Sequence, residues 1–404
     1  MNNGLNYTFI FGGGAVRGIS YIGVIKALRE LNITADAIAG SSVGAIFAVL
    51  YSLGFTTEEL QEIMFEFSFN KFKDINLNFG PNFAFSKGQV FLDWLRELIE
   101  QKVYGEEYEK GKNPPVKFID IDKDLYILTC DLMNNTPFVF SKNNTPEFEI
   151  AMAVRISASF PGLMNPSEYK DTILIDGDLV KSWPLWKTDR FLTESTSRIL
   201  EFRLEGYKES GTIKNPLDYF NMVFSAFSNF CTENVINCYG ENDKYDYILI
   251  DTKDVLLIDF ALEEQKRLEL MSNGYETTIN YFKKDLIKKK KQLLPCYYKL
   301  LNNLLDTHSL LLKNKIPEAQ NKLFKTMSDL NDCRQYIDSS FLKNITEFKN
   351  RFISDIKKTY IFNTYKLNNA TNHSKSLLGI VDALSDKCNE LNNYIDNFGN
   401  AKFK

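Results

Sequence analysis

The segment 40–44, which reads Gly-Ser-Ser-Val-Gly, has the spacing of a serine nucleophile at a sharp turn. It stands between an apolar run at 35–39, which predicts a strand, and an apolar run at 45–53, which predicts a helix. A serine in such a turn has a strained backbone, and its flanking glycines let the chain reverse without clashes. We therefore expect Ser42 to project its hydroxyl over a strand end. The N–H of Val43, at the helix N-terminus, would favour developing negative charge. The same pattern also arises as a plain glycine-rich turn.

A second glycine cluster, segment 12–18, reads Gly-Gly-Gly-Ala-Val-Arg-Gly. It follows a predicted strand at 7–11 and precedes a predicted helix at 19–31. Backbone N–H groups in such a turn approach a ligand oxygen closely. A dinucleotide-binding turn beginning at the first glycine would have Arg17 in place of its third glycine, and a P-loop would have Ile19 in place of its lysine. Nucleotide binding is therefore disfavoured.

A serine hydroxyl needs a proton acceptor within hydrogen-bond reach to act as a nucleophile. The only two histidines, His308 and His373, stand far along the chain from both glycine turns. A carboxylate is the remaining choice, and Asp176 directly follows the apolar run 173–175, which predicts a strand. An Asp-Gly pair is also a common hairpin turn, which is the alternative for Asp176 and its neighbour Gly177.

The elements that would position these residues follow a strand-turn-helix order twice in succession at the start of the chain. This order predicts an α/β fold with a central mixed, mainly parallel sheet and helices on both faces. Further predicted strands lie at 125–131, 137–141, 173–175, 199–203 and 247–251. Apolar residues at intervals of three and four between 268 and 282 predict a helix that packs back on this domain.

The chain after residue 285 has no strand signal and carries apolar residues at helical spacing. We expect a domain at 1–284 and a helical C-terminal module at 285–404, whose role the sequence leaves open. The lysine run Lys288–Lys291 with its apolar flanks fits an anionic membrane surface, and it fits a solvated helix face equally well.

Composition narrows the classes of partner and compartment. A net charge of −4 and a pI near 5.6 argue against nucleic acid. No run reaches the roughly 18 apolar residues of a spanning helix, and the N-terminus has no basic stretch typical of a signal peptide. The six cysteines are scattered without metal-ligand spacing. These features predict a cytoplasmic or peripheral membrane protein, and a non-Sec export route stays open.

Together the two glycine segments, 12–18 and 40–44, and the Asp-Gly pair at 176–177 resemble the patatin-like phospholipase family. The segments 36–39 and 157–162 resemble it as well, so that the likeness runs from about Leu5 to Lys284. The resemblance implies metal-independent hydrolysis of acyl esters without a cofactor, with Ser42 as nucleophile and Asp176 as proton acceptor. It also implies an oxyanion hole in the backbone of Gly12, Gly13 and Gly14, with Arg17 nearby.

Two residues near the predicted site, Asp178 and Arg17, need a separate interpretation. The family often has Gly or Ala after Asp-Gly, whereas this chain has Asp178, which we expect to lie in solvent beyond a turn. Arg17 is expected to meet an oxyanion or a lipid phosphate, or else to lie on a helix surface.

The predicted function is a lipid acyl hydrolase of the phospholipase A or lipase type, acting on phospholipid or another acyl lipid at a membrane surface. An acyltransferase or thioesterase with the same Ser-Asp dyad is one alternative, because the acceptor is chosen by pocket shape and water exclusion. An inactive scaffold that binds a membrane or a protein is the other. A protein activator is possible in principle, but nothing in the sequence points to one.

Overall fold

The structure is a computed structural model of the 404-residue chain. It describes residues 7–66, 84–179, 198–205, 213, 219, 222–223, 226, 245–257, 259, 262–333, 337, 339–362 and 367–399. The chain falls into two compact units. We call Leu5–Tyr281 the sheet unit and the unit that begins at Phe282 the helical unit.

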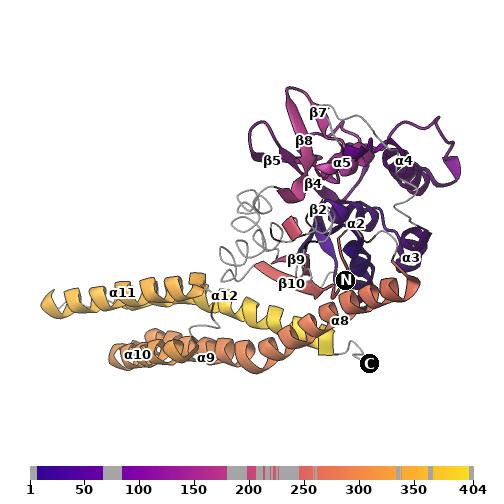
Figure 1. Ribbon diagram of the computed structural model, residues 1–404. Helices are drawn as coiled ribbons and strands as arrows, with labels where there is room; N and C mark the ends of the chain where they lie inside the picture. The colour runs from indigo at the N-terminus through magenta and orange to yellow at the C-terminus, as the bar shows by residue number, and fades with distance from the viewer. Residues whose placement is uncertain are drawn as a thin grey trace. The chain divides into compact units, whose positions relative to one another are not determined.

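The sheet unit is built on an eight-stranded sheet with the order β10-β9-β1-β2-β4-β8-β7, in which β5 also pairs with β4 (Figure 1). Strands β10, β9, β1, β2 and β4 run parallel, and β5, β7 and β8 run antiparallel to their neighbours. The bounds are β1 (Tyr7–Phe11), β2 (Ala35–Ser41), β4 (Asp124–Asp131), β5 (Thr136–Ser141), β7 (Ser167–Tyr169), β8 (Thr172–Asp176), β9 (Arg198–Glu205) and β10 (Tyr245–Asp251). A separate pair joins β3 (Ala84–Ser86) to β6 (Gly162–Met164).

Strands β2 and β8 meet end to end along one side of β4. The pairing of β2 with β4 ends at Ser41 opposite Leu128, and the pairing of β8 with β4 ends at Asp176 opposite Thr129. Strand β5 pairs with one edge of β4 from Tyr126 to Asp131, which includes both ends of these pairings. Strands β2 and β8 therefore pair with the opposite edge of β4. Their carboxyl ends therefore abut.

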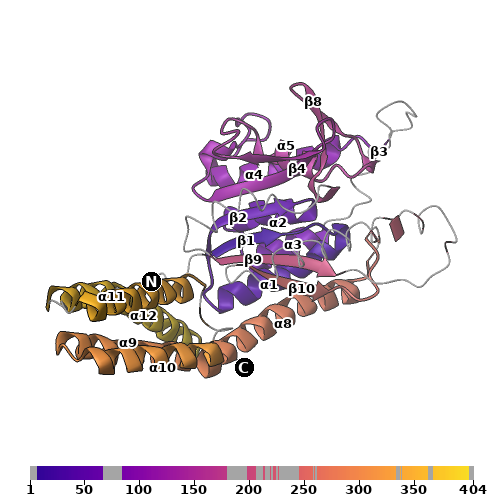
Figure 2. The same ribbon diagram turned by 90° about the vertical axis from the view of Figure 1, so that its left-hand side faces the viewer.

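Helices cover one face of the sheet with an aromatic core. Phe9 of β1 contacts Tyr51 of α2 (Val43–Ser52), and Phe11 of β1 contacts Tyr21 of α1 (Ser20–Glu30). Phe202 of the neighbouring strand β9 packs against both phenylalanines. Helix α2 lies against β1 and β2 (Figure 2). The remaining helices of this unit are η1 (Ala15–Ile19), α3 (Thr57–Glu66), α4 (Gln89–Tyr104), η3 (Gly105–Glu107), η4 (Phe118–Asp120), α5 (Ile150–Ser157), η5 (Gly177–Leu179) and most of α8 (Glu264–Lys288).

Two glycines let α8 approach α1 at backbone distance. A Cβ on Gly23 would lie 1.9 Å from the carbonyl oxygen of Met271, and a Cβ on Gly274 would lie 2.0 Å from that of Ser20. The first part of α8 therefore packs on the sheet unit, as its apolar spacing predicts.

The helical unit has its own core. A π-helical turn, η6 (Lys289–Leu293), leads into α9 (Leu294–Leu312), α10 (Ile316–Cys333), α11 (Ser339–Phe362) and α12 (Leu367–Gly399). Buried Leu304, Leu323, Phe352 and Leu384 belong to one apolar cluster contributed by these helices. Lys289 is buried and pairs with Asp285, whereas the other lysines of the Lys288–Lys291 run are exposed.

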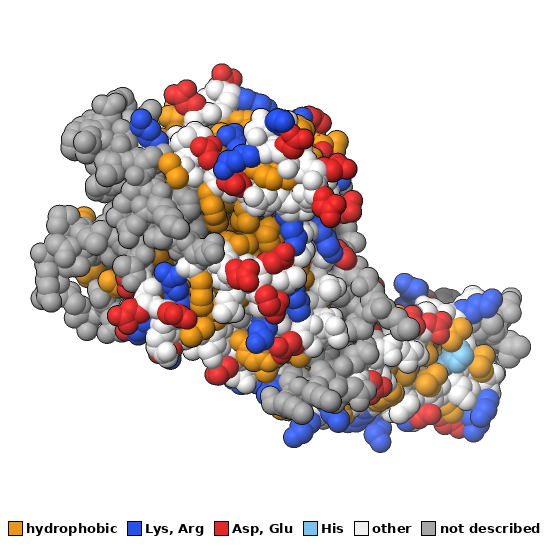
Figure 3. All heavy atoms as spheres, turned by 90° about the vertical axis from the view of Figure 1, so that its right-hand side faces the viewer, with side chains coloured by type: hydrophobic (Ala, Val, Ile, Leu, Met, Phe, Trp, Pro, Cys, Tyr) orange, Lys and Arg blue, Asp and Glu red, His pale blue; other side chains and the backbone are white. Residues whose placement is uncertain are grey.

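The surface mixes charge with apolar side chains. On the face that Figure 3 draws, Lys and Arg side chains are interspersed with Asp and Glu, without a broad region of one sign. Among the described residues no helix is both long and apolar enough to cross a bilayer.

The predicted fold class is confirmed: the sheet is mixed and mainly parallel, helices pack on it, and the C-terminal region is helical. Each strand predicted from the sequence falls within one of the long strands. The short strands β3, β6 and β7 were not predicted, because three residues carry too little pattern.

Candidate active site

Ser42 stands at the abutting ends of β2 and β8, in the turn between β2 and α2. Its backbone has φ 52° and ψ −127°, a region that non-glycine residues rarely adopt and that stores on the order of 1–3 kcal/mol of strain. The flanking glycines permit this conformation. A Cβ on Gly40 would lie 2.3 Å from the carbonyl oxygen of Gly44, and one on Gly44 would lie 2.0 Å from that of Phe11.

The substitution Gly44→Ala is expected to lower the free energy of unfolding of the sheet unit by about 3 kcal/mol, because the new methyl group meets backbone atoms of β1 that cannot move alone. Tryptophan fluorescence during urea unfolding measures this, since all three tryptophans precede residue 282. Gly54→Ala is the control: its φ of 76° costs about 1 kcal/mol, but no atom lies within 4 Å. Equal losses in the two variants would refute the close-approach explanation.

The hydroxyl of Ser42 donates a hydrogen bond to the carboxylate of Asp176, with 2.7 Å between Oγ and Oδ2. Asp176 is 1% exposed, and Ser42 is half-buried. The structure thus brings the two predicted catalytic residues into direct contact, although they are 134 residues apart in sequence. This is the geometry that a serine nucleophile and its base require.

Two serines at the end of α5 hold this pair in place. The N–H of Ser42 donates to Oγ of Ser157 at 3.0 Å, and Ser157 in turn donates to the carbonyl of Leu128 at 2.6 Å. The N–H of Asp176 donates to the carbonyl of Ser159 at 3.1 Å. The sequence of segment 157–162 resembles the family but does not predict that its serines position Ser42 and Asp176, because tertiary contacts set these hydrogen-bond partners.

Burial raises the pKa of Asp176 well above its usual range, and the nearby charge of Asp178 raises that pKa further. The N–H of Asp178, which donates to Oδ1 of Asp176 at 2.9 Å, and the hydroxyl of Ser42 favour the ionised form and act in the opposite direction. A carboxylate with a raised pKa is a stronger base than an exposed one, which suits proton abstraction from a hydroxyl.

The expectation that Asp178 lies in solvent was wrong. The short helix η5 turns the chain back, so that Oδ1 of Asp178 accepts hydrogen bonds from the N–H of Gly13, at 3.3 Å, and from the hydroxyl of Ser41. A Cβ on Gly13 would lie 1.4 Å from the other carboxylate oxygen, so only glycine leaves room for Asp178. Burial raises the pKa of Asp178, while the Ser41 hydroxyl, the positive charge of Arg203 and the Gly13 N–H oppose the rise.

The three glycines predicted to form an oxyanion hole have different surroundings. Gly12 donates its N–H to the carbonyl of Phe202 at 3.0 Å, and Gly13 donates to Asp178. Gly14 has φ 145°, and a Cβ there would lie 2.7 Å from Leu204. Val43 begins α2 directly after Ser42, as predicted.

Arg17 does not lie on a helix surface, which corrects that alternative, and its contact with an oxyanion or a lipid phosphate stays a prediction. The residue is 4% exposed, and its Nε donates to the carbonyl of Val255 at 2.7 Å. Burial lowers the pKa of Arg17 to about 10. Its partner lies 238 residues away in sequence, in the segment after β10, which is why local pattern misplaced it.

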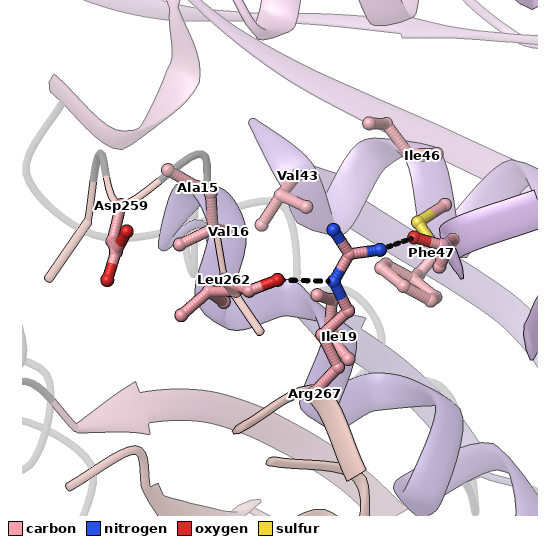
Figure 4. A pocket seen from close by; sticks show the side chains of 10 residues that line it. Ala15, Val16, Ile19, Val43, Ile46, Phe47, Asp259, Leu262 and Arg267 are labelled. Carbon is pink, nitrogen blue, oxygen red and sulfur yellow. Dashed lines mark hydrogen bonds between the residues drawn. The ribbon is translucent and has the colours of Figure 1, made fainter. Parts of the chain in front are cut away.

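An apolar pocket opens beside Val43. It lies between η1, α2, the end of α3 and the start of α8, and its space, open solvent at the mouth included, is about 430 Å³ (Figure 4). Arg267 secures one wall, because its side chain donates to the carbonyls of Leu262 at 3.1 Å and of Phe65 at 2.8 Å. The lining residues are Ala15, Val16, Ile19, Val43, Ile46, Phe47, Met64, Asp259, Leu262 and Arg267.

Both histidines lie in the helical unit. His308 is part of α9, and His373 of α12 is buried with Nε2 3.2 Å from Oδ2 of Asp355. Among the described residues no group of three His, Cys, Asp or Glu side chains has the arrangement of a metal site.

Part of the chain matches a known protein family, and several known proteins are similar to it. Residues 9–186 match the patatin-like phospholipase family. YqhO of Bacillus subtilis is 25% identical over 299 residues, which cover 68% of this chain and 97% of that protein. The probable lipid hydrolase 463L of Invertebrate iridescent virus 6 is 23% identical over 44% of this chain and 61% of its own length. Lysophospholipase NTE1 of Lodderomyces elongisporus is 27% identical over 45% of this chain and 11% of its own length. Residues 9–186, which match the patatin-like phospholipase family, hold both glycine turns, Ser42 and Asp176.

Proposed function

We propose that this protein is a lipid acyl hydrolase in which Ser42 forms an acyl-enzyme and Asp176 accepts the proton. The observation that carries the proposal is the 2.7 Å hydrogen bond from Ser42 Oγ to Asp176 Oδ2 at the strand ends. The match of residues 9–186 to the patatin-like phospholipase family and the similarity to a probable lipid hydrolase and a lysophospholipase support an acyl lipid as substrate.

In the first half-reaction Ser42 Oγ attacks the carbonyl carbon of the ester, and its proton passes to Asp176 Oδ2. The carbonyl electron pair moves onto oxygen and returns when the bond to the leaving alcohol breaks. The alcohol takes the proton from Asp176, and the acyl group remains on Ser42. Asp176 is thus base and then acid in one half-reaction.

In the second half-reaction water attacks the acyl carbon and gives its proton to Asp176. The bond to Ser42 Oγ breaks, the oxygen takes the proton back, and a fatty acid leaves. Both halves need the same short contact, so one carboxylate suffices and no histidine is required. An acceptor alcohol or thiol in place of water would give transfer instead of hydrolysis.

The negative charge on the carbonyl oxygen needs donors in both half-reactions. The first turn of α2, which begins at Val43, and the glycine turn are the nearest sources of backbone N–H groups. The Gly13 N–H becomes available to an oxyanion only when Asp178 releases it. The protonated form of Asp178, which burial favours, holds this N–H less tightly than the carboxylate does.

The apolar pocket beside Val43 suits the acyl chain. Its walls are mostly aliphatic and aromatic, and each buried methylene of a chain contributes roughly 0.8 kcal/mol to binding. Val43, the residue that follows Ser42, lines this pocket, whereas Ser42 and Asp176 are not among its lining residues.

Two measurements on the purified full chain test the proposal. Fatty-acid release from mixed phospholipid vesicles is followed by mass spectrometry, and a fluorophosphonate, which reacts with activated serines, is mapped by peptide mass. We expect free fatty acid from wild-type protein and the phosphonyl mass on Ser42. Acyl transfer to an added alcohol without free acid would replace hydrolysis by transferase chemistry. Absence of any product together with an unlabelled Ser42 would overturn the proposal.

A further inference from the structure

The turn between β4 and β5 displays two large apolar side chains. Leu132 is 46% exposed and Met133 is 63% exposed, and we call this pair the apolar tip. The remaining turn residues, Asn134 and Asn135, are also exposed, and none of the four is charged. Adjacent exposed apolar side chains on a projecting turn are unusual enough to indicate a contact surface.

The apolar tip lies past the sheet edge at which Ser42 stands. Strand β4 runs parallel to β2, and its Leu128 is opposite Ser41. Leu132 is four residues farther along, which is roughly 13 Å at the rise of a strand. Strands β5, β7 and β8 accompany this extension of β4 (Figure 1). The tip therefore projects beyond the end of β2, after which Ser42 stands.

Hydrogen bonds fix the conformation of the turn. The carboxylate of Asp131 accepts from the N–H of Asn134 at 3.0 Å and from its side-chain amide at 2.9 Å, and it also accepts from the hydroxyl of Thr172. The N–H of Leu132 donates to the carbonyl of Ile173 at 2.9 Å. A fixed turn presents its apolar side chains without the entropy cost of ordering a loose loop.

The adjacent turn between β7 and β8 adds polar and aromatic groups. Lys170 is exposed, with its Nζ 5.2 Å from the ring centre of Tyr169. Asp171 and Glu168 are exposed as well, so this turn carries no excess of positive charge. The arrangement, apolar at the tip with a tyrosine and a lysine behind it, is typical of groups at a membrane interface.

We propose that the apolar tip inserts into the surface of a zwitterionic phospholipid layer and thereby delivers lipid to the edge that carries Ser42. The choice of a neutral lipid surface follows from the uncharged tip and from the acidic balance of the adjacent turn. The inference rests on the proposed function for its purpose, although insertion itself can be measured without catalysis. It assigns to Leu132 and Met133 a role that the lysine run Lys288–Lys291, an electrostatic element, does not have.

The test compares wild-type protein with the double variant Leu132→Ser, Met133→Ser. Co-sedimentation with phosphatidylcholine vesicles is measured at low and high salt, together with hydrolysis of those vesicles and of a short-chain ester dissolved below its aggregation limit. We expect vesicle binding and vesicle hydrolysis to fall about tenfold in the variant, because two apolar side chains that enter the lipid layer are replaced by polar ones. Hydrolysis of the dissolved ester should be unchanged, and raising the salt should not release wild-type protein.

A matched control is Ile119→Ser. The exposed fraction of Ile119, 47%, matches that of Leu132, 46%. Ile119 lies in η4, however, which precedes the amino end of β4. This variant should bind vesicles like wild type. Unchanged vesicle binding by the double variant, or an equal loss of binding in the control, would overturn the inference. In either case, hydrolysis of the dissolved ester would still support the proposed function. Vesicle binding that depends on the tip, without hydrolysis of any ester, would uphold the inference and refute the function.

Discussion

The substitution Ser42→Ala is expected to lower hydrolysis of acyl esters by about 10⁴-fold or more, because the proposed covalent route begins with attack by the Ser42 hydroxyl. The hydroxyl of Ser42 bonds to the carboxylate of Asp176. Steady-state rates on a dissolved ester measure the effect without complications from lipid packing. The residual rate should come from binding and from the oxyanion donors alone.

Ser41→Ala is the matched control, since Ser41 is the preceding residue and its hydroxyl bonds to Asp178 and not to Asp176. We expect this variant to keep its rate within about tenfold of wild type. A further variant, Ser42→Gly, separates folding from catalysis. Glycine relieves the strain at φ 52°, so this variant should be equally inactive yet more stable than wild type by about 1 kcal/mol. Activity in Ser42→Ala, or equal inactivity in Ser41→Ala, would move the nucleophile away from Ser42.

Much of this site could be predicted from the sequence because its parts are local. Gly40 and Gly44 are required within one turn, and the apolar runs on either side set the strand and the helix. The contact between Ser42 and Asp176 is different. It exists because the pairing of β8 with β4 ends at Thr129, the residue that follows Leu128, where the pairing of β2 with β4 ends. The pattern of apolar and polar residues does not predict that register. The pairing of Ser42 with Asp176 was predicted only from the order of the motifs that resemble the family.

The errors have the same physical origin. An Asp-Gly-Asp sequence predicts a solvated turn, and nothing local tells that Gly13 leaves space for the carboxylate of Asp178. A cation near a helix start fits a helix surface, whereas Arg17 is buried and donates to the carbonyl of Val255 in a distant segment. Buried polar groups take whichever partner the fold brings near them, so their roles follow from tertiary structure.

The second large effect is expected from Asp176→Asn. An amide cannot take the proton of Ser42, so the rate should fall by about 10²–10⁴-fold. The control is Asp178→Asn, which keeps an oxygen for the hydrogen bonds from Gly13 and Ser41 but removes a negative charge. It should keep most of the activity at neutral pH. A loss in Asp178→Asn as deep as in Asp176→Asn would mean that the proton acceptor is shared by the pair.

The pH profile separates the two carboxylates further. In the proposed mechanism Asp176 acts only when ionised. Because the charge of Asp178 raises the pKa of Asp176, Asp178→Asn should lower that pKa and move the acid limb of kcat/KM to lower pH. Stability should change as well. Both carboxyls have raised pKa values in the folded state, so the stability that their protonation contributes is complete below the ordinary Asp pKa and is lost as pH rises through the folded values. Removing one of them should therefore raise the unfolding midpoint at neutral pH and leave it nearly unchanged at acid pH. An acid limb that stays in place in Asp178→Asn would show that burial alone sets the basicity of Asp176.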